Sequence, residues 1–276
     1  MSAPKPRNPP HWPAALAVVI LALSILSPAH ARAQNLVDTT WRLRPMTQAQ
    51  LRVEHRGVDI VGMRLPPAAD YDIPLADPAA TVAKIKAAVD RVIVLSKVSA
   101  RGLARLAEQG RIRIVYDAAF PERSLSRVIV AAFLVGEFQP QDGKRDFTVV
   151  VGRFGANWPV EDLAAVLVHE LIGHGVQRLM NRFGHDRPID LECEARLWQQ
   201  LYYVDAAMPQ DTREMVEFRT TTDRRVCHDF RRFVAKARPG MMRAWDTGRP
   251  DMAGLLDLFQ DYYAAARHTR KTGHNR

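Results

Sequence analysis

Hydrophobic positions in the first half of the chain change their spacing from a helical period to short strand-like runs. Apolar residues recur at helical spacing through residues 80–95, and a second helical pattern covers residues 100–110. Short runs rich in β-branched residues then follow, separated by Pro, Gly and Asp. We predict two helices and then strands of a small sheet, at Arg111–Tyr116, Val128–Val135 and Asp146–Val151. Residues 34–74 are turn-rich and interrupted by prolines, so no long regular element is expected there.

The second half of the chain has mainly helical patterns. Pro159 precedes an apolar helical pattern that continues to Met180, as expected of a proline in the first turn. After a loop, Asp190 can cap a further helix over residues 191–204. From Asp211 onward, apolar and basic residues recur at helical spacing and predict packing helices. The sequence therefore predicts an α+β fold with a small mixed sheet and C-terminal helices.

The N-terminal segment has the pattern of a secretory signal peptide rather than of the folded domain. Lys5 and Arg7 precede an apolar run at residues 14–27, and Ala-x-Ala steps follow up to Ala33. The run is shorter than the ~20 residues that a membrane-spanning helix needs. We therefore expect a protein exported to the periplasm or secreted, with no stable membrane span after cleavage. The expected organisation is a signal peptide at 1–33 and one domain at 34–276, with an N-terminal part (34–110), a metal-site core (111–206) and a helical C-terminal part (207–276).

Charge and composition exclude some classes of partner. The formal net charge is +9, and removing Lys5, Arg7 and Arg32 with the signal peptide leaves +6 by subtraction. The basic residues are scattered and show no face interleaved with exposed aromatics, so we expect no nucleic-acid partner. The two cysteines, in an exported protein, predict either a Cys193–Cys227 disulfide or two buried free thiols.

The strongest chemical signal is the sequence HELIGH, from His169 to His174. In the familiar zinc-protease motif H-E-x-x-H, two histidines four residues apart share one helical face and the glutamate between them acts as a base. Here the histidines are five residues apart, which in an ideal α-helix separates them by about 140°. A π-type turn of about 4.4 residues reduces that angle to about 50°. We predict such a turn, with Gly173 absorbing the distortion.

A catalytic zinc usually has three protein ligands and one water, so a third ligand is expected from another element. The helix predicted at residues 191–204 offers Glu192 and Glu194. A helical wheel places Glu194 on the apolar side, whereas Glu192 lies with polar residues. The wheel alone therefore favours Glu194 as the inward carboxylate.

The two motifs resemble those of a known peptidase family. His169–His174 matches the H-E-x-x-G-H motif of the dipeptidyl peptidase III family, and Glu192–Ala195 (E-C-E-A) resembles the E-C-R-A core of that family's second motif, E-E-C-R-A-E. Many gluzincins similarly show E-x-x-A, with the zinc ligand first. Leu191 stands where the family has Glu, and the match covers only these two motifs. The resemblance therefore implies metal chemistry and leaves the substrate open.

Carried over by position, the resemblance implies a zincin-like fold in which His169, His174 and Glu192 bind Zn²⁺. It also implies that Glu170 is the general base, and we keep Glu194 as the alternative third ligand. The expected function is hydrolysis of a peptide or protein substrate by an exported zinc metallopeptidase. The alternatives are a non-catalytic metal-binding or structural protein and a secreted effector with the same chemistry.

Two further features would serve this chemistry. We predict that Asp146–Val151 is an edge strand that pairs with an extended substrate. A developing oxyanion would need a further donor. The candidates for that donor are His185, His228, Tyr202 and Tyr203.

Overall fold

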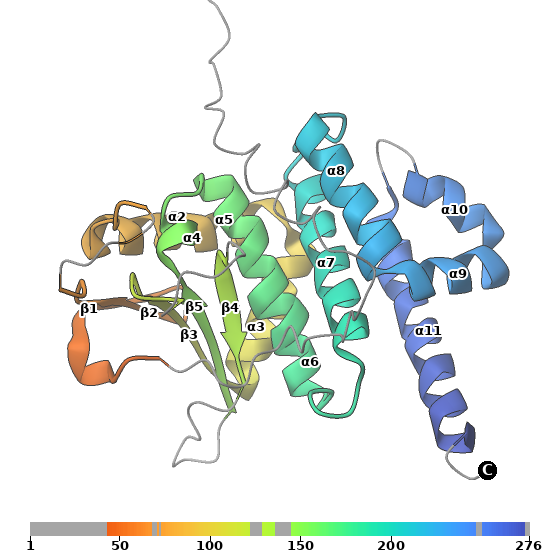
Figure 1. The fold of residues 1–276 in the computed structure, drawn as a ribbon, viewed down its shortest axis with the longest axis horizontal. Coiled ribbons are helices and arrows are strands. Elements are labelled where there is room, and N and C mark those ends of the chain that lie inside the picture. Colours follow the sequence, from red (N-terminus) through yellow and green to blue (C-terminus); the bar gives the residue numbers. More distant parts are fainter. Residues whose placement is uncertain are drawn as a thin grey trace, which may run out of the picture.

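The computed structural model describes residues 43–67, 71, 73–121, 129–135, 145–246 and 250–273, so the predicted signal peptide lies outside the described residues. It contains a mixed five-stranded sheet in the order β1-β2-β3-β5-β4, beside a group of helices (Figure 1). The central strands β2, β3 and β5 are parallel, and the outer strands β1 and β4 run antiparallel to their neighbours. The predicted α+β class is confirmed. The strands are β1 (Ala49–His55), β2 (Val58–Met63), β3 (Gly110–Tyr116), β4 (Ala131–Leu134) and β5 (Arg145–Val151).

The sheet differs from the sequence prediction in two places. A hairpin, β1–β2, occupies part of the region expected to be irregular, and Arg56 and Gly57 turn it with φ values of 54° and 76°. The second difference concerns β5, which is flanked by β3 and β4 and so cannot be the substrate-pairing edge that we predicted. The edge strand at that end of the sheet is β4.

Two helices cover one face of the sheet and follow the predicted boundaries closely. Helix α2 (Pro78–Leu95) begins where the Asp77 side chain accepts a hydrogen bond from the backbone N–H of Ala80. A separate short turn, η1 (Met46–Gln48), precedes β1. Helix α3 (Lys97–Gln109) is capped in the same way by Ser96. Both caps satisfy amide donors that lack a partner within the helix.

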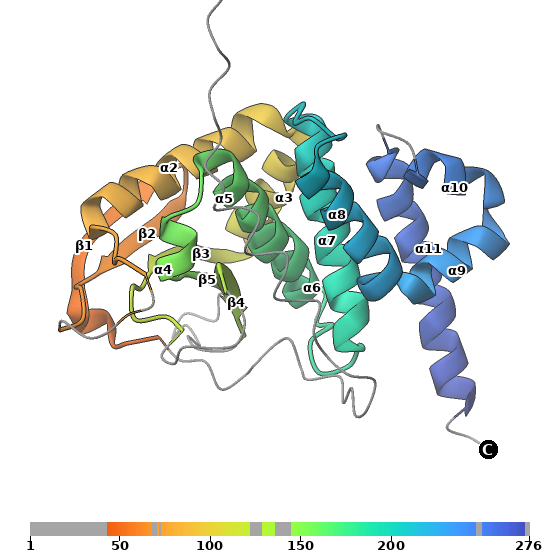
Figure 2. The ribbon, with the colours of Figure 1, turned by 45° about the horizontal axis from the view of Figure 1, so that its top comes forward.

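Of the remaining helices, α4 and α5 lie beside the sheet, and α7 to α11 extend away from it (Figure 2). Short helix α4 follows β5, and α5, η2 and α6 then run without a break. Long helix α7 lies between this group and the C-terminal helices (Figure 1). Their bounds are α4 (Arg153–Ala156), α5 (Val160–Leu167), η2 (Val168–His174), α6 (Gly175–Leu179), α7 (Pro188–Asp205), α8 (Arg213–Thr221), η3 (Thr222–Val226), α9 (His228–Ala237), α10 (Pro239–Asp246) and α11 (Met252–Gly273).

Helix α7 is buried on two opposite sides because it contributes to two hydrophobic clusters. Tyr202 and Tyr203 pack into the cluster between the sheet, α2, α3 and α5. Leu197 and Leu201 pack into a second cluster with residues of α9 and α11, among them Phe230 and Phe259. Burial of such side chains stabilises the fold by about 1.5–3 kcal/mol each. Helix α7 thus joins the sheet to the C-terminal helices.

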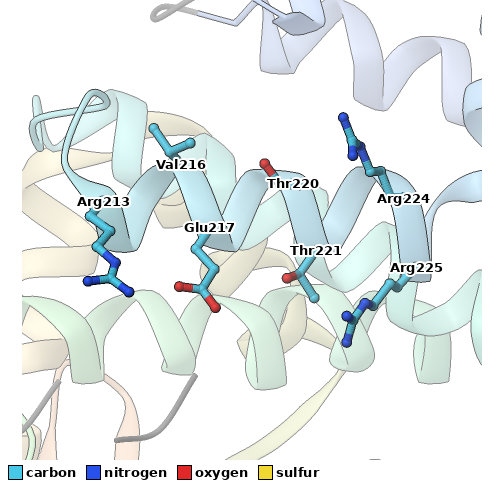
Figure 3. A pocket seen from close by; sticks show the side chains of 7 residues that line it. All are labelled: Arg213, Val216, Glu217, Thr220, Thr221, Arg224 and Arg225. Atoms are coloured by element: carbon cyan, nitrogen blue, oxygen red, sulfur yellow. The ribbon is translucent and has the colours of Figure 1, made fainter. Parts of the chain in front are cut away.

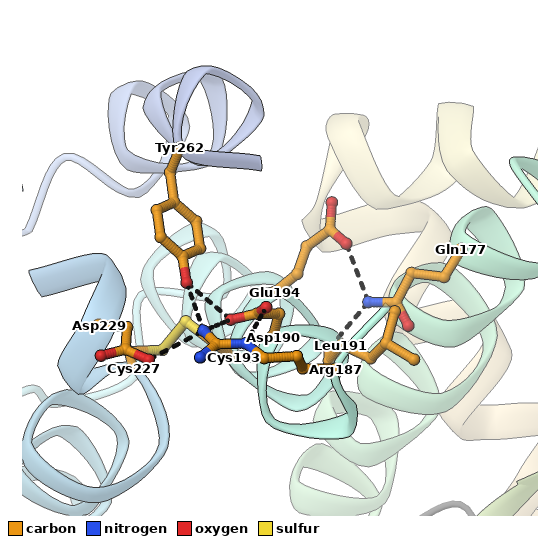
Figure 4. The surroundings of a disulfide bond; sticks show 9 residues. All are labelled: Gln177, Arg187, Asp190, Leu191, Cys193, Glu194, Cys227, Asp229 and Tyr262. Atoms are coloured by element: carbon orange, nitrogen blue, oxygen red, sulfur yellow. Dashed lines mark hydrogen bonds and ion pairs between the residues drawn. A yellow bond between two sulfur atoms is a disulfide. The ribbon is translucent and has the colours of Figure 1, made fainter. Parts of the chain in front are cut away.

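A disulfide strengthens this junction. Cys193 of α7 is bonded to Cys227, which lies between η3 and α9 (Figure 4). Of the two alternatives left open by the sequence, the disulfide is therefore present. Within the described part of the chain, no helix is both long and apolar enough to cross a membrane.

Candidate metal centre

The predicted π-helical turn is present. Residues Val168–His174 form η2, in which the backbone bonding pattern is that of a π-helix, between the α-helical segments α5 and α6. The wider turn brings His169 and His174 onto one face of the helix, with ring centroids 5.0 Å apart and ring planes at 85°. Both imidazoles are buried, with 7% and 4% of their residues' surface exposed. A five-residue spacing is therefore compatible with a shared site.

Gly173 has a role beyond the one that we predicted. It lies within the π-helical segment without a positive φ, so no left-handed conformation requires glycine there. A Cβ atom added at Gly173 would lie 2.7 Å from Cβ and 2.8 Å from Cα of Ala195 on α7. Such distances are too short for carbon atoms. Glycine at 173 and alanine at 195 therefore allow η2 and α7 to approach each other closely.

This close approach places Glu192 between the two histidines. One carboxylate oxygen of Glu192, Oε1, is 3.4 Å from Nε2 of His174, and the other, Oε2, is 3.6 Å from Nε2 of His169. The Glu170 carboxylate is 4.0 Å from each of the same two nitrogens. His169, Glu170 and His174 each offer an atom within 4.8 Å of the others. The predicted metal ligands His169, His174 and Glu192 and the predicted base Glu170 therefore meet in one place.

Glu170 is also anchored to the sheet. Its Oε2 accepts a hydrogen bond of 2.8 Å from the backbone N–H of Phe133, on the edge strand β4. Burial raises the pKa of Glu170 to about 7, and the nearby charge of Glu192 acts in the same direction. His174, the Phe133 amide and Arg196 lower that pKa, but by less. A carboxylate with a pKa near neutrality is suited to accept and release a proton.

The other site residues are strongly coupled. Burial lowers the pKa of His169 to about 3, which favours its neutral form. His174 and Glu192 act on each other in opposite directions. Although burial disfavours both charges, the hydrogen bond and attraction between them raise the pKa of His174 and lower that of Glu192. The carboxylate of Glu192 and a neutral imidazole of His169 are the forms that bind metal ions.

The structure places Glu194 outside the site. It is 1% exposed, and its carboxylate bonds to Arg182 and Gln177 and has no described contact with His169. The helical wheel correctly indicated that Glu194 is buried. That burial is explained by an ion pair with Arg182 at 2.6 Å.

None of the four predicted oxyanion donors has a described direct contact with His169, Glu170 or His174. His185 and His228 are exposed. The Tyr203 hydroxyl accepts a hydrogen bond from Gln199, and that of Tyr202 is buried without a hydrogen-bond partner among the described residues. Burial raises the pKa of Tyr202 to about 12. Tyr202 is therefore a packing residue of α7, whereas Tyr203 is linked to the site through Gln199, whose side chain acts to raise the pKa of His169.

Sequence reasoning overlooked Arg196, one helical turn after Glu192. Its positive charge lowers the pKa of both Glu170 and Glu192, so the guanidinium lies within electrostatic range of the site. Its Nε is buried and has no hydrogen-bond partner in the described structure, and its Cζ lies 5.2 Å from the centre of the Phe218 ring. The sequence could have indicated Arg196, because it lies four residues after Glu192 and therefore on the same side of helix α7.

A separate surface hollow lies along α8 and η3 (Figure 3). Figure 3 shows Arg213, Glu217 and Arg225 on one side of this helix and Arg224 on another. None of the residues that line it belongs to the histidine cluster, and it brings together no set of groups suited to catalysis. The lining residues are Arg213, Val216, Glu217, Thr220, Thr221, Arg224 and Arg225.

The contact between Gly173 and Ala195 predicts the effect of adding a single methyl group. Gly173→Ala should destabilise the protein by roughly 1–3 kcal/mol, because η2 and α7 must move apart. Chemical unfolding measures this loss. Gly240→Ala is the matched control, since a Cβ at Gly240 meets no atom within 4 Å. Equal stability of the two variants would contradict the proposed close contact.

Comparison with known proteins does not assign this chain to a family. Searches of protein-family models, curated proteins and solved structures return no match. The resemblance to dipeptidyl peptidase III therefore depends on His169–His174 and Glu192–Ala195 alone.

Proposed function

We propose that this protein is a zinc-dependent peptidase with Glu170 as its general base. The observation that carries the proposal is the position of Glu192, whose two oxygens lie 3.4 and 3.6 Å from Nε2 of His174 and His169. We also propose that the protein acts outside the cytoplasm. The Cys193–Cys227 disulfide supports export, because disulfides persist mainly in oxidising compartments.

The donor set fits a zinc ion. Bonds of 2.0–2.2 Å in a tetrahedral arrangement place neighbouring ligand atoms roughly 3.3–3.6 Å apart. The separations of 3.6 and 3.4 Å from the Glu192 oxygens to His169 and His174 fall in that range. Two imidazole nitrogens and one carboxylate form a common ligand set of catalytic zinc sites. Glu170 is farther from both nitrogens, at 4.0 Å, as suits a base outside the ligand set.

The protein groups around this site have distinct roles in the proposed hydrolysis. A bound zinc would supply a Lewis acid that polarises the peptide carbonyl and lowers the pKa of a bound water to about 7. Glu170 accepts the proton of the attacking water and delivers it to the leaving amine. Its hydrogen bond to Phe133 holds the carboxylate in place during both steps. A nearby cation would lower the pKa of Glu170 and favour the ionised base.

The edge strand β4 supports a peptide as the substrate. The Val130 carbonyl accepts a hydrogen bond from Gly152 on the β5 side, whereas the Phe133 N–H points to Glu170 on the outer side. The backbone N–H and C=O groups of successive strand residues point alternately to the two sides of the strand. Those of Ala131, like those of Phe133, therefore point away from β5. An extended peptide added to this edge would pair with that backbone. Its scissile bond would then lie beside Glu170.

Arg196 is the group best suited to stabilise the negative charge of the tetrahedral intermediate. It is a cation in range of Glu170 and Glu192, and its buried Nε has no hydrogen-bond partner among the described residues. Preorganised donors of this kind act strongly because the site excludes water. We therefore propose Arg196 in place of the four donors that were predicted from the sequence.

Replacing His174 tests the metal site. His174→Ala should lose most of its bound zinc, because the remaining donors His169 and Glu192 leave coordination incomplete. Metal analysis of the purified protein measures the change. His185→Ala is the control, since His185 is exposed and should leave the zinc content unchanged. Zinc content that is identical in both variants would show that position 174 does not coordinate.

Replacing Glu170 tests catalysis separately. Glu170→Gln should retain zinc and lose cleavage by a factor of about 10²–10⁴, because the amide cannot accept the proton of water. Digestion of a mixed peptide library, paired with metal analysis, measures both properties. If wild type binds zinc but cleaves no peptide, the non-catalytic alternative holds. If the variant cleaves as well as wild type, Glu170 is not the base.

Replacing Arg196 tests charge stabilisation. Arg196→Gln should bind zinc normally and reduce kcat by about 10²–10³, the usual cost of losing one donor to an oxyanion. Steady-state kinetics on a peptide cleaved by wild type provide the measurement. Arg196→Lys keeps the charge and should retain more activity than Arg196→Gln. An unchanged kcat in Arg196→Gln would exclude this role.

A further inference from the structure

A buried chain of hydrogen bonds extends from His174 away from the site. Gln177, on α6, is 0% exposed, and its Oε1 lies 2.9 Å from Nδ1 of His174. Its Nε2 donates to the backbone carbonyl of Leu191 at 2.8 Å and to Oε2 of Glu194 at 2.9 Å (Figure 4). Gln177 therefore connects the site helix to α7 at a second point, separate from the contact between Gly173 and Ala195.

The partners of Gln177 fix which way its amide faces. A carbonyl and a carboxylate are acceptors only, so both hydrogens of the Nε2 amide must point to Leu191 and Glu194. Turning the amide over would place its oxygen against two acceptors. The oxygen of Gln177 must therefore face His174, and an oxygen of this kind can only accept a hydrogen bond. It follows that Nδ1 of His174 carries a hydrogen.

That conclusion determines which nitrogen of His174 is free to bind a metal ion. When Nδ1 is the protonated nitrogen of a neutral imidazole, Nε2 has the free electron pair. Nε2 is the atom that lies 3.4 Å from Glu192. The bond to Gln177 also restricts rotation of the ring. One buried amide thus determines both the tautomer and the orientation of His174.

Glu194 is in turn held rigidly. Arg182, which is 1% exposed, donates to its Oε2 at 2.6 Å, and Gln260 of α11 donates to its Oε1 at 3.0 Å. Arg182 also bonds Asp186 at 2.7 Å and stacks 3.8 Å from the centre of the Tyr263 ring. A carboxylate buried to this extent is tolerated only when it is paired and hydrogen-bonded. The C-terminal helix α11 therefore takes part in fixing the position of Gln177.

We propose that Gln177, oriented by Glu194, is the positioning residue that presents Nε2 of His174 to the metal ion. The proposal rests on the proposed function, because it requires His174 to be a ligand. It assigns a purpose to Glu194, which the sequence left as an alternative ligand. Partners that bind the second nitrogen of a metal-binding histidine raise its basicity and fix its tautomer.

The test compares two glutamines buried to a similar degree. Gln177→Leu should bind Zn²⁺ roughly 10- to 100-fold more weakly than wild type, the usual effect of removing such a partner. Gln200→Leu is the control. Gln200 is 3% exposed on α7 and donates to Gln210, not to a site residue. Zinc affinity is measured by competition with a chromogenic chelator, and thermal unfolding of both variants reports general damage to the core.

The outcomes separate this proposal from the proposed function. If wild type binds zinc, and Gln177→Leu binds it as tightly as wild type or Gln200→Leu, the role of Gln177 is wrong and the metal site stands. If wild type binds no zinc, both proposals fail together.

A second measurement needs no variant and so does not depend on the folding of Gln177→Leu. Nitrogen-15 NMR of the zinc-loaded wild-type protein should show His174 with a hydrogen on Nδ1 and zinc at Nε2. Zinc at Nδ1, with the hydrogen on Nε2, would overturn the proposal.

Discussion

The contact between η2 and α7 is the constraint on which the rest of the site depends. Two helices usually pack with their axes 8–10 Å apart, at a distance set by the side chains between them. Here the facing residues are Gly173 and Ala195, and the space left by a missing Cβ is filled by the neighbouring helix. Only at this short separation can a side chain as short as Glu192 reach both His169 and His174. The small residues are therefore as necessary to the site as the polar ones.

Helix α7 shows how one element can serve several roles through successive residues. Glu192 points to the histidines, Cys193 to the disulfide and Glu194 to Arg182, and these neighbours are spaced by about 100° around the helix. Each direction is buried, so each polar group needs a specific partner. A helix buried on two sides has little solvent-facing surface on which to place a charge without a partner. The burial of α7 explains why its acids are held so firmly.

The sequence predicted the local features of the site and not the arrangement of the sheet. The five-residue spacing of His169 and His174 has one helical solution, so the π-helical turn could be derived. The choice between Glu192 and Glu194 could not be derived from a helical wheel, because the wheel assumes one buried face and α7 has two. The Arg56–Gly57 turn gives little signal, since Arg rarely adopts positive φ. The inner position of β5 depends on the order of the strands in the sheet, which no local sequence pattern predicts.

The hydrogen bond between Glu170 and the backbone of Phe133 connects the local geometry of the site to the arrangement of the sheet. Glu170 belongs to the helix that holds the histidines, and Phe133 belongs to the edge strand that would hold the substrate. In the proposed reaction, a base must stay within hydrogen-bond distance of both water and the leaving amine. A base anchored only to its own helix would shift relative to a peptide bound along β4. Because Glu170 bonds to β4 directly, the base and the peptide backbone are positioned by the same strand. The strand order that the sequence did not reveal is therefore what would align the substrate with the proposed chemistry.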